Sequence, residues 1–294
     1  MKAFRKKHQP ILTLVFILLC AAVIIPFLML VSISFSSEKS VIEYGYGLIP
    51  KEFSLDAYKY VFKNPKAIID AYKVTAIFSI SKMVLAVVFT SMIAYPLSRR
   101  NLKGRRAISF YLYFTMLFGG GLVPTYILIT QYLHLGDTMW VYILPGLVSP
   151  WYVFMMRTFF QDLPEEMIES AVIDGAGEYT IYAKFIIPLS KPVLATIGLM
   201  TFLAMWNDWY TSMLYINKQE LESLQYLLQK IMLNLKLLQD SSMNPGASMV
   251  SLKDIPSETV RMAMAIVVAG PALVVFPFFQ KYFVRGLTVG SVKG

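Results

Sequence analysis

The run Ile11-Leu-Thr-Leu-Val-Phe-Ile-Leu-Leu-Cys-Ala-Ala-Val-Ile-Ile-Pro-Phe-Leu-Met-Leu-Val-Ser-Ile-Ser-Phe35 decides the fold class of this 294-residue chain. It contains no charged residue, and it is longer than the roughly 20 apolar residues with which an α-helix crosses a bilayer. Lys2, Arg5, Lys6 and Lys7 precede it, as basic residues also precede a secretory signal core. Because the run exceeds such a core and lacks a small-x-small cleavage site, we expect a retained membrane helix.

Five further apolar runs follow the first. Hydrophobic residues make up 56% of the chain and charged residues only 15%, too few to cover the surface of a soluble domain of this length. The sequence therefore predicts an all-α, polytopic membrane protein in which residues 1–294 form a single domain with six transmembrane helices. The expected spans are 11–35, 71–97, 107–132, 139–160, 193–216 and 260–282.

The lysines and arginines of the short connections predict the orientation of these spans. Four precede the first span, five lie in the turn 98–106, and none lies in His134–Thr138. Basic residues favour the cytoplasmic side, so both termini, the 98–106 turn and the 161–192 loop are expected in the cytoplasm. Residues 36–70 and 217–259 then form the outer loops.

Several chemistries are excluded by what the sequence lacks. The net charge of +9 sits at the ends of apolar runs, which indicates membrane topology and not nucleic-acid binding. Cys20 is the single cysteine, and His8 and His134 are far apart, so no disulfide and no metal site are expected. No Gly-x4-Gly-Lys-Ser/Thr phosphate loop is present, so no catalytic residue and no cofactor are expected on this chain.

The stretch Asp162-Leu-Pro-Glu-Glu-Met-Ile-Glu-Ser-Ala-Val-Ile-Asp-Gly-Ala-Gly-Glu178 is the most informative part of the 161–192 loop. Asp162 can cap a helix whose first turn contains Pro164, and Gly175 can end it. A second short helix is expected from Glu178 toward Ile186, ended by prolines. From the residues alone, a capped helix of this kind could equally lie on the lipid headgroups.

Glu169-Ser-Ala, Asp174-Gly-Ala and Phe185-Ile-Ile-Pro188 resemble the EAA loop of binding-protein-dependent ABC importers in order and spacing. That family has Glu-Ala-Ala, a glycine four residues after the second alanine, and an aliphatic-x-Leu-Pro ending; this chain departs at Ser170, Phe185 and Ile187. In that family the loop forms coupling helices that dock into a cleft of the ATPase subunit. The resemblance implies ATPase coupling by Glu166, Glu169, Ser170, Ala171, Asp174, Gly175, Ala176 and Pro188.

Two further stretches resemble the carbohydrate branch of the same family. Residues Gln280–Gly294 are similar to the tail of maltose-transporter-type permeases, which implies an ATPase contact by Arg285, Gly286 and Lys293. Phe118-Gly-Gly-Gly-Leu-Val-Pro-Thr-Tyr126 resembles permeases that handle oligosaccharides and complex glycans.

The resemblance implies a bacterial inner-membrane importer of sugars, expected to be oligosaccharides. The expected partners are a second, non-identical permease, a dimer of ATPase subunits that holds ATP and Mg, and an extracytoplasmic sugar-binding protein, besides the sugar and membrane lipid. A secondary transporter would show inverted repeats, and an intramembrane enzyme a Ser–His or paired-Asp constellation; neither pattern is evident.

A sugar pathway is expected in the fifth span, at Trp206-Asn-Asp-Trp209-Tyr210. Sugars stack their C–H faces on aromatic rings and hydrogen-bond to amides and carboxylates, which makes Trp206, Asn207, Asp208 and Tyr210 the candidates. Helix packing and an aromatic belt are the alternative. Asp208, Lys82 and Arg261 are charges at membrane depth, which snorkel, pair with a neighbour or line a pathway. Gln219–Gln239 is expected to form an amphipathic outer helix.

Overall fold

The computed structural model describes residues 2–242 and 257–290, with side chains described for 10–237 and 258–280. Within these ranges the regular structure is helical, and the one strand-type contact is an isolated bridge between Ser36 and Phe53. The prediction of an all-α protein is therefore confirmed. The chain divides into two compact units, one of residues 1–68 with 228–271 and one of residues 69–227 with 272–294.

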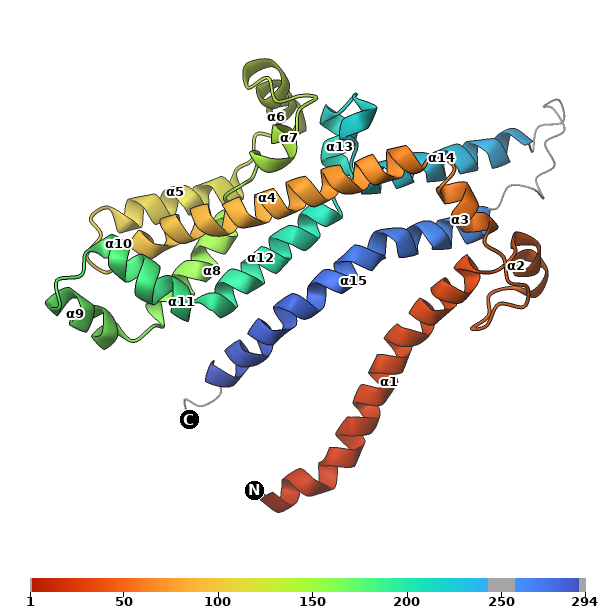
Figure 1. Cartoon of the computed structure of the whole chain (residues 1–294). Coiled ribbons are helices and arrows are strands. Elements are labelled where there is room, and N and C mark those ends of the chain that lie inside the picture. The colour runs from red at the N-terminus through yellow and green to blue at the C-terminus, as the bar shows by residue number, and fades with distance from the viewer. Residues whose placement is uncertain (1, 243–256, 291–294) are drawn as a thin grey trace. The chain divides into compact units, whose positions relative to one another are not determined.

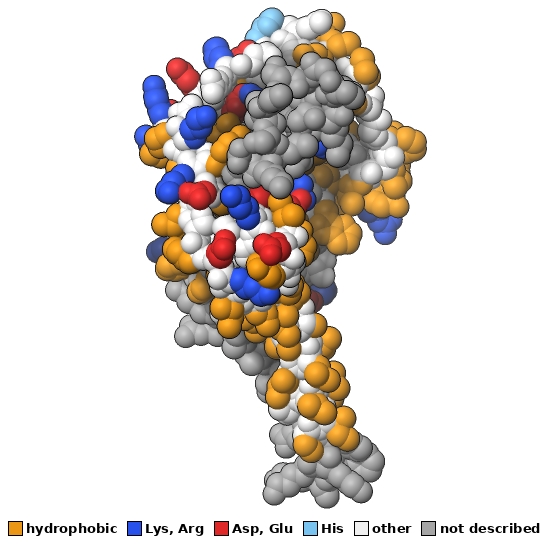
Figure 2. All heavy atoms as spheres, turned by 90° about the vertical axis from the view of Figure 1, so that its right-hand side faces the viewer, with side chains coloured by type: hydrophobic (Ala, Val, Ile, Leu, Met, Phe, Trp, Pro, Cys, Tyr) orange, Lys and Arg blue, Asp and Glu red, His pale blue; other side chains and the backbone are white. Residues whose placement is uncertain are grey.

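Three helices are each long and apolar enough to cross a membrane: α1 (Lys2–Ser34), α4 (Pro65–Ser98) and α15 (Ser257–Gly290). They coincide with the first, second and last expected spans. In α1 the apolar segment from Pro10 to Ser34 has no buried residue in its most apolar window. Figure 2 shows hydrophobic side chains along its visible side. Such a surface needs lipid or a partner as its surroundings.

The third expected span, 107–132, is bent. Helix α5 (Arg105–Leu117) ends before three glycines, and the chain then turns by 110° into α6 (Leu122–Ile127) and a π-helical turn, η1 (Leu128–Tyr132). Gly121 has a φ of +83°, a conformation that glycine adopts at little cost. The glycine-rich motif thus marks a bend in the chain.

The fourth and fifth expected spans are also interrupted. Residues 139–160 divide into α7 (Trp140–Ile143) and α8 (Pro150–Gln161), and the break between them holds Pro145 and the left-handed Gly146. Residues 193–216 divide into α12 (Lys191–Trp206) and α13 (Tyr210–Tyr215). The described part of the chain thus has three candidate spans, or up to five if each of two bent pairs counts as one span. Six spans stay a prediction.

In the unit of residues 69–227, α4, α5, α8 and α12 run side by side, and α8 contacts both α5 and α12 (Figure 1). One core cluster lies around Phe78 and Tyr142, whose rings stack with centroids 4.2 Å apart. A second cluster joins α4, α8 and α12 to the 161–192 loop through buried side chains that include Met156 and Ile197. The loop is therefore packed onto the helices.

Lys82 lies in the middle of α4 and is only 8% exposed. Its Nζ donates hydrogen bonds to the carbonyl oxygens of Tyr142 (3.0 Å) and Pro145 (2.9 Å). Tyr142 lies in the last turn of α7 and Pro145 lies between α7 and α8, so both carbonyls are at a place where regular helical hydrogen bonding ends. The charge thus neither snorkels nor forms a short ion pair; it satisfies backbone oxygens at a helix break.

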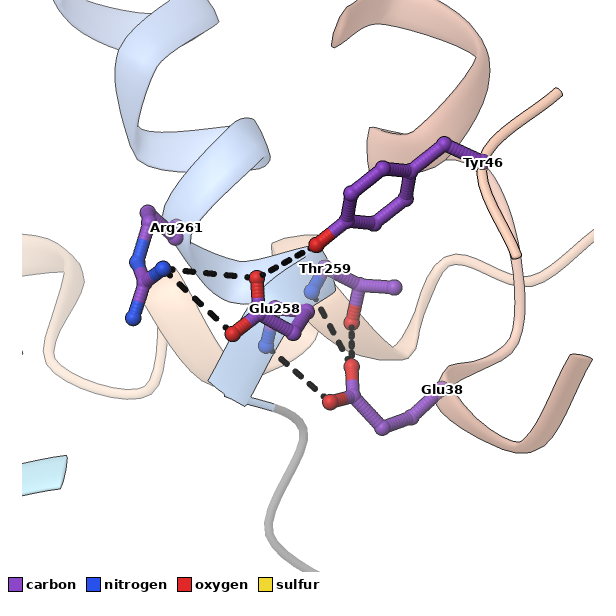
Figure 3. A network of polar contacts seen from close by, with 5 residues as sticks. All are labelled: Glu38, Tyr46, Glu258, Thr259 and Arg261. Carbon is purple, nitrogen blue, oxygen red and sulfur yellow. Dashed lines mark hydrogen bonds and ion pairs between the residues drawn. The ribbon is translucent and has the colours of Figure 1, made fainter. Parts of the chain in front are cut away.

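In the other unit, the short helix α2 (Glu38–Tyr44) is joined to the start of α15, as Figure 3 shows. The Glu38 carboxylate accepts hydrogen bonds from the backbone N–H groups of Glu258 and Thr259, both at 3.0 Å, and from the Thr259 hydroxyl at 2.7 Å. Glu38 thereby satisfies two of the N–H groups that a helix start leaves unpaired. We call these contacts the Glu38 cap.

Tyr46 and Arg261 complete this network (Figure 3). The Tyr46 hydroxyl donates to the Glu258 carboxylate at 3.1 Å, and Arg261 pairs with the same carboxylate at 3.3 Å. The hydrogen bond to Glu258 is the main reason that the pKa of Tyr46 is raised. Arg261 is thus paired with Glu258, which lies one helical turn before it on α15.

The described parts of segments 36–70 and 217–259 contain further helices. α3 (Asp56–Val61) follows α2, and the leucine-rich segment forms the short 3₁₀ turn η3 (Gln219–Leu221) and α14 (Leu224–Ser242). In α14, Leu224, Leu228 and Leu235 are buried, whereas Leu233 is exposed. The prediction of an amphipathic helix is confirmed, because the buried leucines recur at helical spacing.

Replacing Lys82 by Met keeps the length of the side chain but removes the donor to both carbonyls. We expect Lys82→Met to lower the free energy of unfolding by about 2 kcal/mol, because buried carbonyls lose a charged partner. Thermal unfolding of the purified protein measures the loss. Lys73→Met on the same helix is the control, since the Lys73 side chain is 68% exposed. Equal melting temperatures for the two variants would contradict this role.

Glu38→Ala removes the cap of α15. We expect a loss of about 1 kcal/mol in stability, as for other helix caps, and faster hydrogen exchange at the Glu258 and Thr259 amides. Hydrogen exchange with mass spectrometry measures the second effect. Glu43→Ala is the control, because Glu43 is an exposed residue of the same short helix. It should leave the stability and the amide exchange unchanged. Similar exchange rates in Glu38→Ala and Glu43→Ala would count against the cap.

Candidate functional site

The candidate site is built on α9 (Glu165–Ile173), the short helix of the 161–192 loop. Pro164 precedes it with extended backbone, and Glu165 and Glu166 occupy its first turn, where acidic residues complement the positive helix end. The expectation that Asp162 caps this helix is wrong. Helix α8 continues to Gln161, so Asp162 instead ends α8, with its N–H donating to the carbonyls of that helix.

The end of α9 follows the prediction. Asp174 closes the helix, and Gly175 takes a left-handed φ of +80°. The N–H of Ala176 then donates to the carbonyl oxygen of Ala171 at 2.9 Å, so the chain leaves the helix through a hydrogen-bonded turn. No atom lies within 4 Å of where a Gly175 side chain would begin, so the backbone conformation alone requires glycine.

One side of α9 faces the core and the other is open. Ile168 and Ala171 are buried, whereas Glu166, Glu169, Ser170, Asp174 and Gly175 are exposed. The exposed side also carries apolar residues: Ile173 is 85% exposed, and Tyr179, at the start of the next helix, is 87% exposed. Two neighbouring short helices that present Ile173 and Tyr179 to the exterior beside carboxylates are typical of a surface that a protein partner covers.

The second part of the loop is one bent helical segment. It consists of α10 (Glu178–Ile181), the π-helical turn η2 (Tyr182–Ile186) and α11 (Ile187–Leu189). The expected end before Pro188 is wrong, because the helix runs past this exposed proline to Leu189. The π turn explains this, since wider hydrogen bonding accommodates a residue without an N–H. The segment then meets α12 at an angle of 76°.

Polar residues on α4 and directly after its end hold this second segment. Ser91 and Tyr182 share a hydrogen bond of 2.6 Å, and the Tyr95 hydroxyl donates to the Glu178 carboxylate. Arg99 pairs with the same carboxylate at 3.7 Å. We call these contacts the α4 row.

The α4 row was missed from the sequence. Positions 91 and 95 are spaced by four and so share one face of α4, and position 99 follows directly after the end of the helix. Positions 178 and 182 likewise share one face of the second segment. That spacing on an otherwise apolar helix was the available signal.

Charged groups also link the turn after α4 to α9. Arg100 lies 3.7 Å from the Glu165 carboxylate, and an open cavity of about 500 Å³ lies beside this pair. Its lining combines the basic residues 99–100 with Glu169, Ile173 and Glu178. The surface around α9 thus alternates charge of both signs with apolar side chains.

The four candidates for a sugar pathway differ in how accessible their side chains are. Trp206 is buried and stacks on Phe202, with ring centroids 5.6 Å apart. The Asp208 carboxylate accepts the Thr211 N–H at 3.0 Å, which caps α13, and Asn207 donates to the Leu203 carbonyl.

Tyr210, in contrast, is 43% exposed. Trp206 and Asp208 therefore support the break between α12 and α13, while Tyr210 and the exposed Asn207 remain accessible. For the C-terminal candidates, the backbone of Arg285 and Gly286 lies in the last turns of α15, and Lys293 lies outside the described residues.

Comparison with known proteins places this geometry in a family. The profile of the binding-protein-dependent transport system inner membrane component matches residues 86–289, which include the whole 161–192 loop. Protein LplC of Bacillus subtilis is 37% identical over 274 residues, covering 93% of this chain and 90% of that protein. The polygalacturonan/rhamnogalacturonan transport system permease protein YtcP of the same organism is 37% identical over 284 residues, 96% and 95% of the two chains.

Among solved structures, a bacterial ABC transporter involved in the import of the acidic polysaccharide alginate is similar, with a TM-score of 0.78 and 26% sequence identity. The match covers 95% of this chain and 97% of that one. The chain therefore belongs to the inner-membrane component family of binding-protein-dependent transport systems, the permease subunits of ABC importers.

Proposed function

We propose that this chain is a permease subunit of an ATP-driven importer of oligosaccharides, coupled to its ATPase through the 161–192 loop. The observation that carries the proposal is α9, a short helix closed at its end by Gly175, whose inner side is packed on the helices and whose outer side exposes Ile173 and carboxylates. The substrate class is supported by relatives named for polygalacturonan/rhamnogalacturonan and for arabinooligosaccharides, and by the alginate importer.

The nucleotide chemistry belongs to partners in this proposal. ATP and Mg are held by a dimer of ATPase subunits, and a second, non-identical permease completes the pathway. Both termini and the 161–192 loop face the cytoplasm of a bacterial inner membrane. Contacts with the ATPase are made by the exposed side of α9 and by Arg285, Gly286 and Lys293 of the tail. An extracytoplasmic binding protein delivers the sugar to the outer segments 36–70 and 217–259.

The mechanical path follows from the contacts of the loop. A displacement of α9 is passed to the segment 178–189, which is bonded to α4 through Tyr95 and Ser91 and continues into α12. Because packed helices move as rigid bodies, closure of the ATPase dimer tilts α4 and α12 together.

Along the sugar pathway, we assign direct contact to Tyr210 and Asn207, and a supporting role to Trp206 and Asp208.

The function is tested by reconstituting the chain in lipid with its partner permease, binding protein and ATPase, and adding oligosaccharides one at a time. Stimulation of ATP hydrolysis by one oligosaccharide supports the proposal and names the substrate. If no ATPase subunit associates with the chain, the coupling role of the 161–192 loop is wrong. If the subunits assemble but no oligosaccharide stimulates ATP hydrolysis, the proposed substrate class is wrong and the coupling role is retained.

Gly175→Val tests the coupling loop in the same assay. A β-branched residue at a φ of +80° is strained by roughly 1–2 kcal/mol, which shifts the exit from α9. We expect sugar-stimulated ATP hydrolysis and uptake to fall severalfold while the amount of membrane-inserted protein is unchanged. Gly175→Asn is the matched control, because asparagine tolerates this conformation. Unchanged uptake in Gly175→Val would refute the role.

Tyr95→Phe tests the α4 row. The substitution deletes one hydroxyl, and the loss of a hydrogen bond of about 1.5 kcal/mol to a carboxylate should weaken coupling about tenfold. We expect ATP hydrolysis to continue while sugar uptake per ATP falls. Glu178→Gln should act in the same direction. The control is Tyr111→Phe on α5, whose side chain is 66% exposed. A normal ratio of uptake to hydrolysis in Tyr95→Phe would exclude the α4 row from the transmission path.

A further inference from the structure

A second cavity lies beside the first, between the turn that follows α4, the end of α8 and the start of α9. Its volume is about 400 Å³, and its lining includes Ser98, Arg99, Arg100, Arg105, Gln161 and Glu165. Three guanidinium groups thus face one carboxylate. We call this space the arginine cavity.

The positive charges of the arginine cavity are unevenly compensated. Arg99 and Arg100 have carboxylates at 3.7 Å, Glu178 and Glu165. The Nε of Arg105, in contrast, is buried and has no hydrogen-bond partner among the described residues. Arg157 of α8 is held near Arg105, because its guanidinium donates at 2.9 Å to Ser109, one helical turn after Arg105. Three guanidinium groups and one carboxylate on the lining leave an excess of positive charge, which an anion would offset.

The chemistry of the lining selects the kind of anion. Guanidinium groups present planar pairs of donors that fit phosphate oxygens, and Ser98 and Gln161 add neutral polar groups. With Glu165 the only carboxylate on the lining, a singly or doubly charged group would bring the cavity close to neutrality. We propose that the arginine cavity binds a phosphate group, supplied by an anionic phospholipid of the cytoplasmic leaflet.

The position of the cavity supports a lipid as the source of that phosphate. In the orientation proposed above, on which this inference rests, the 98–106 turn lies at the cytoplasmic surface, where anionic headgroups attract basic residues. Helix α5 begins at Arg105 and has no buried residue, and Phe110, Tyr111 and Phe114 are all exposed on it. A headgroup on Arg105 would therefore place its acyl chains beside an apolar helix surface.

Occupation of the arginine cavity has a consequence for the loop. Arg100 and Glu165 both line it, and Glu165 is the first residue of α9. A phosphate held by Arg99, Arg100 and Arg105 ties the basic turn together at the base of α9. The lipid would then hold the basic turn in place while α9 moves.

The test uses the assembled transporter, purified, stripped of lipid and titrated with phosphatidylglycerol or phosphatidylcholine, with retained lipid counted by native mass spectrometry. We expect Arg105→Gln to weaken retention of phosphatidylglycerol about tenfold, the effect of one hydrogen bond to a charged group, and Arg105→Lys to weaken it less. Arg106→Gln is the matched control: it removes the same charge from the same turn, but Arg106 is exposed and does not line the cavity. It should change retention less than twofold.

Inorganic phosphate separates the two sources of the anion. Millimolar phosphate should not raise the melting temperature of the lipid-free protein as phosphatidylglycerol does. If phosphate alone stabilises the wild type and not Arg105→Gln, the lipid assignment is overturned. If Arg105→Gln and Arg106→Gln weaken lipid binding equally, or if neither phosphatidylglycerol nor phosphate binds, the arginine cavity is not an anion-binding site. These measurements need no sugar or ATP, so they stand or fall independently of transport.

Discussion

Lys82 places a positive charge in the middle of a 34-residue apolar helix, and the backbone carbonyls of Tyr142 and Pro145 satisfy it. In hydrocarbon, an irregular segment needs a partner for each polar group. The ammonium group supplies that partner, and the chain can therefore leave the helical conformation between α7 and α8. The course of α8 follows from this break, and α8 in turn leads directly into the 161–192 loop.

α4 is accordingly the helix to which distant segments are bonded. Its Thr75 hydroxyl accepts the Leu224 N–H at 2.9 Å, Lys82 bonds to the break before α8, and Tyr95 holds the segment after α9. Apolar contacts between helices in lipid gain little from the hydrophobic effect, so a few polar contacts can fix how helices meet. The same contacts that fix the structure would carry movement of the loop to the spans.

The sequence predicts the structure correctly where the deciding interactions are between neighbouring residues. The end of α9 at Gly175 was predictable because a left-handed residue after a helix favours glycine. The start of α9 was not, because the end of α8 decides whether Asp162 can act as a cap. Within apolar runs, hydropathy could not show that Gly121 and Gly146 turn the chain. The burial of Trp206, and the bond from Tyr95 to Glu178, depend on residues far away in sequence.

The Glu38 cap has a consequence for the making of the protein. Glu38 and Thr259 are 221 positions apart, so the contact forms only after nearly the whole chain has been synthesised and inserted. Until then, the Glu38 carboxylate lacks the three donors of the cap. A product that terminates early lacks the cap altogether. The start of α15 is therefore the last part of this network to be made, and α2 is joined to it only late in synthesis.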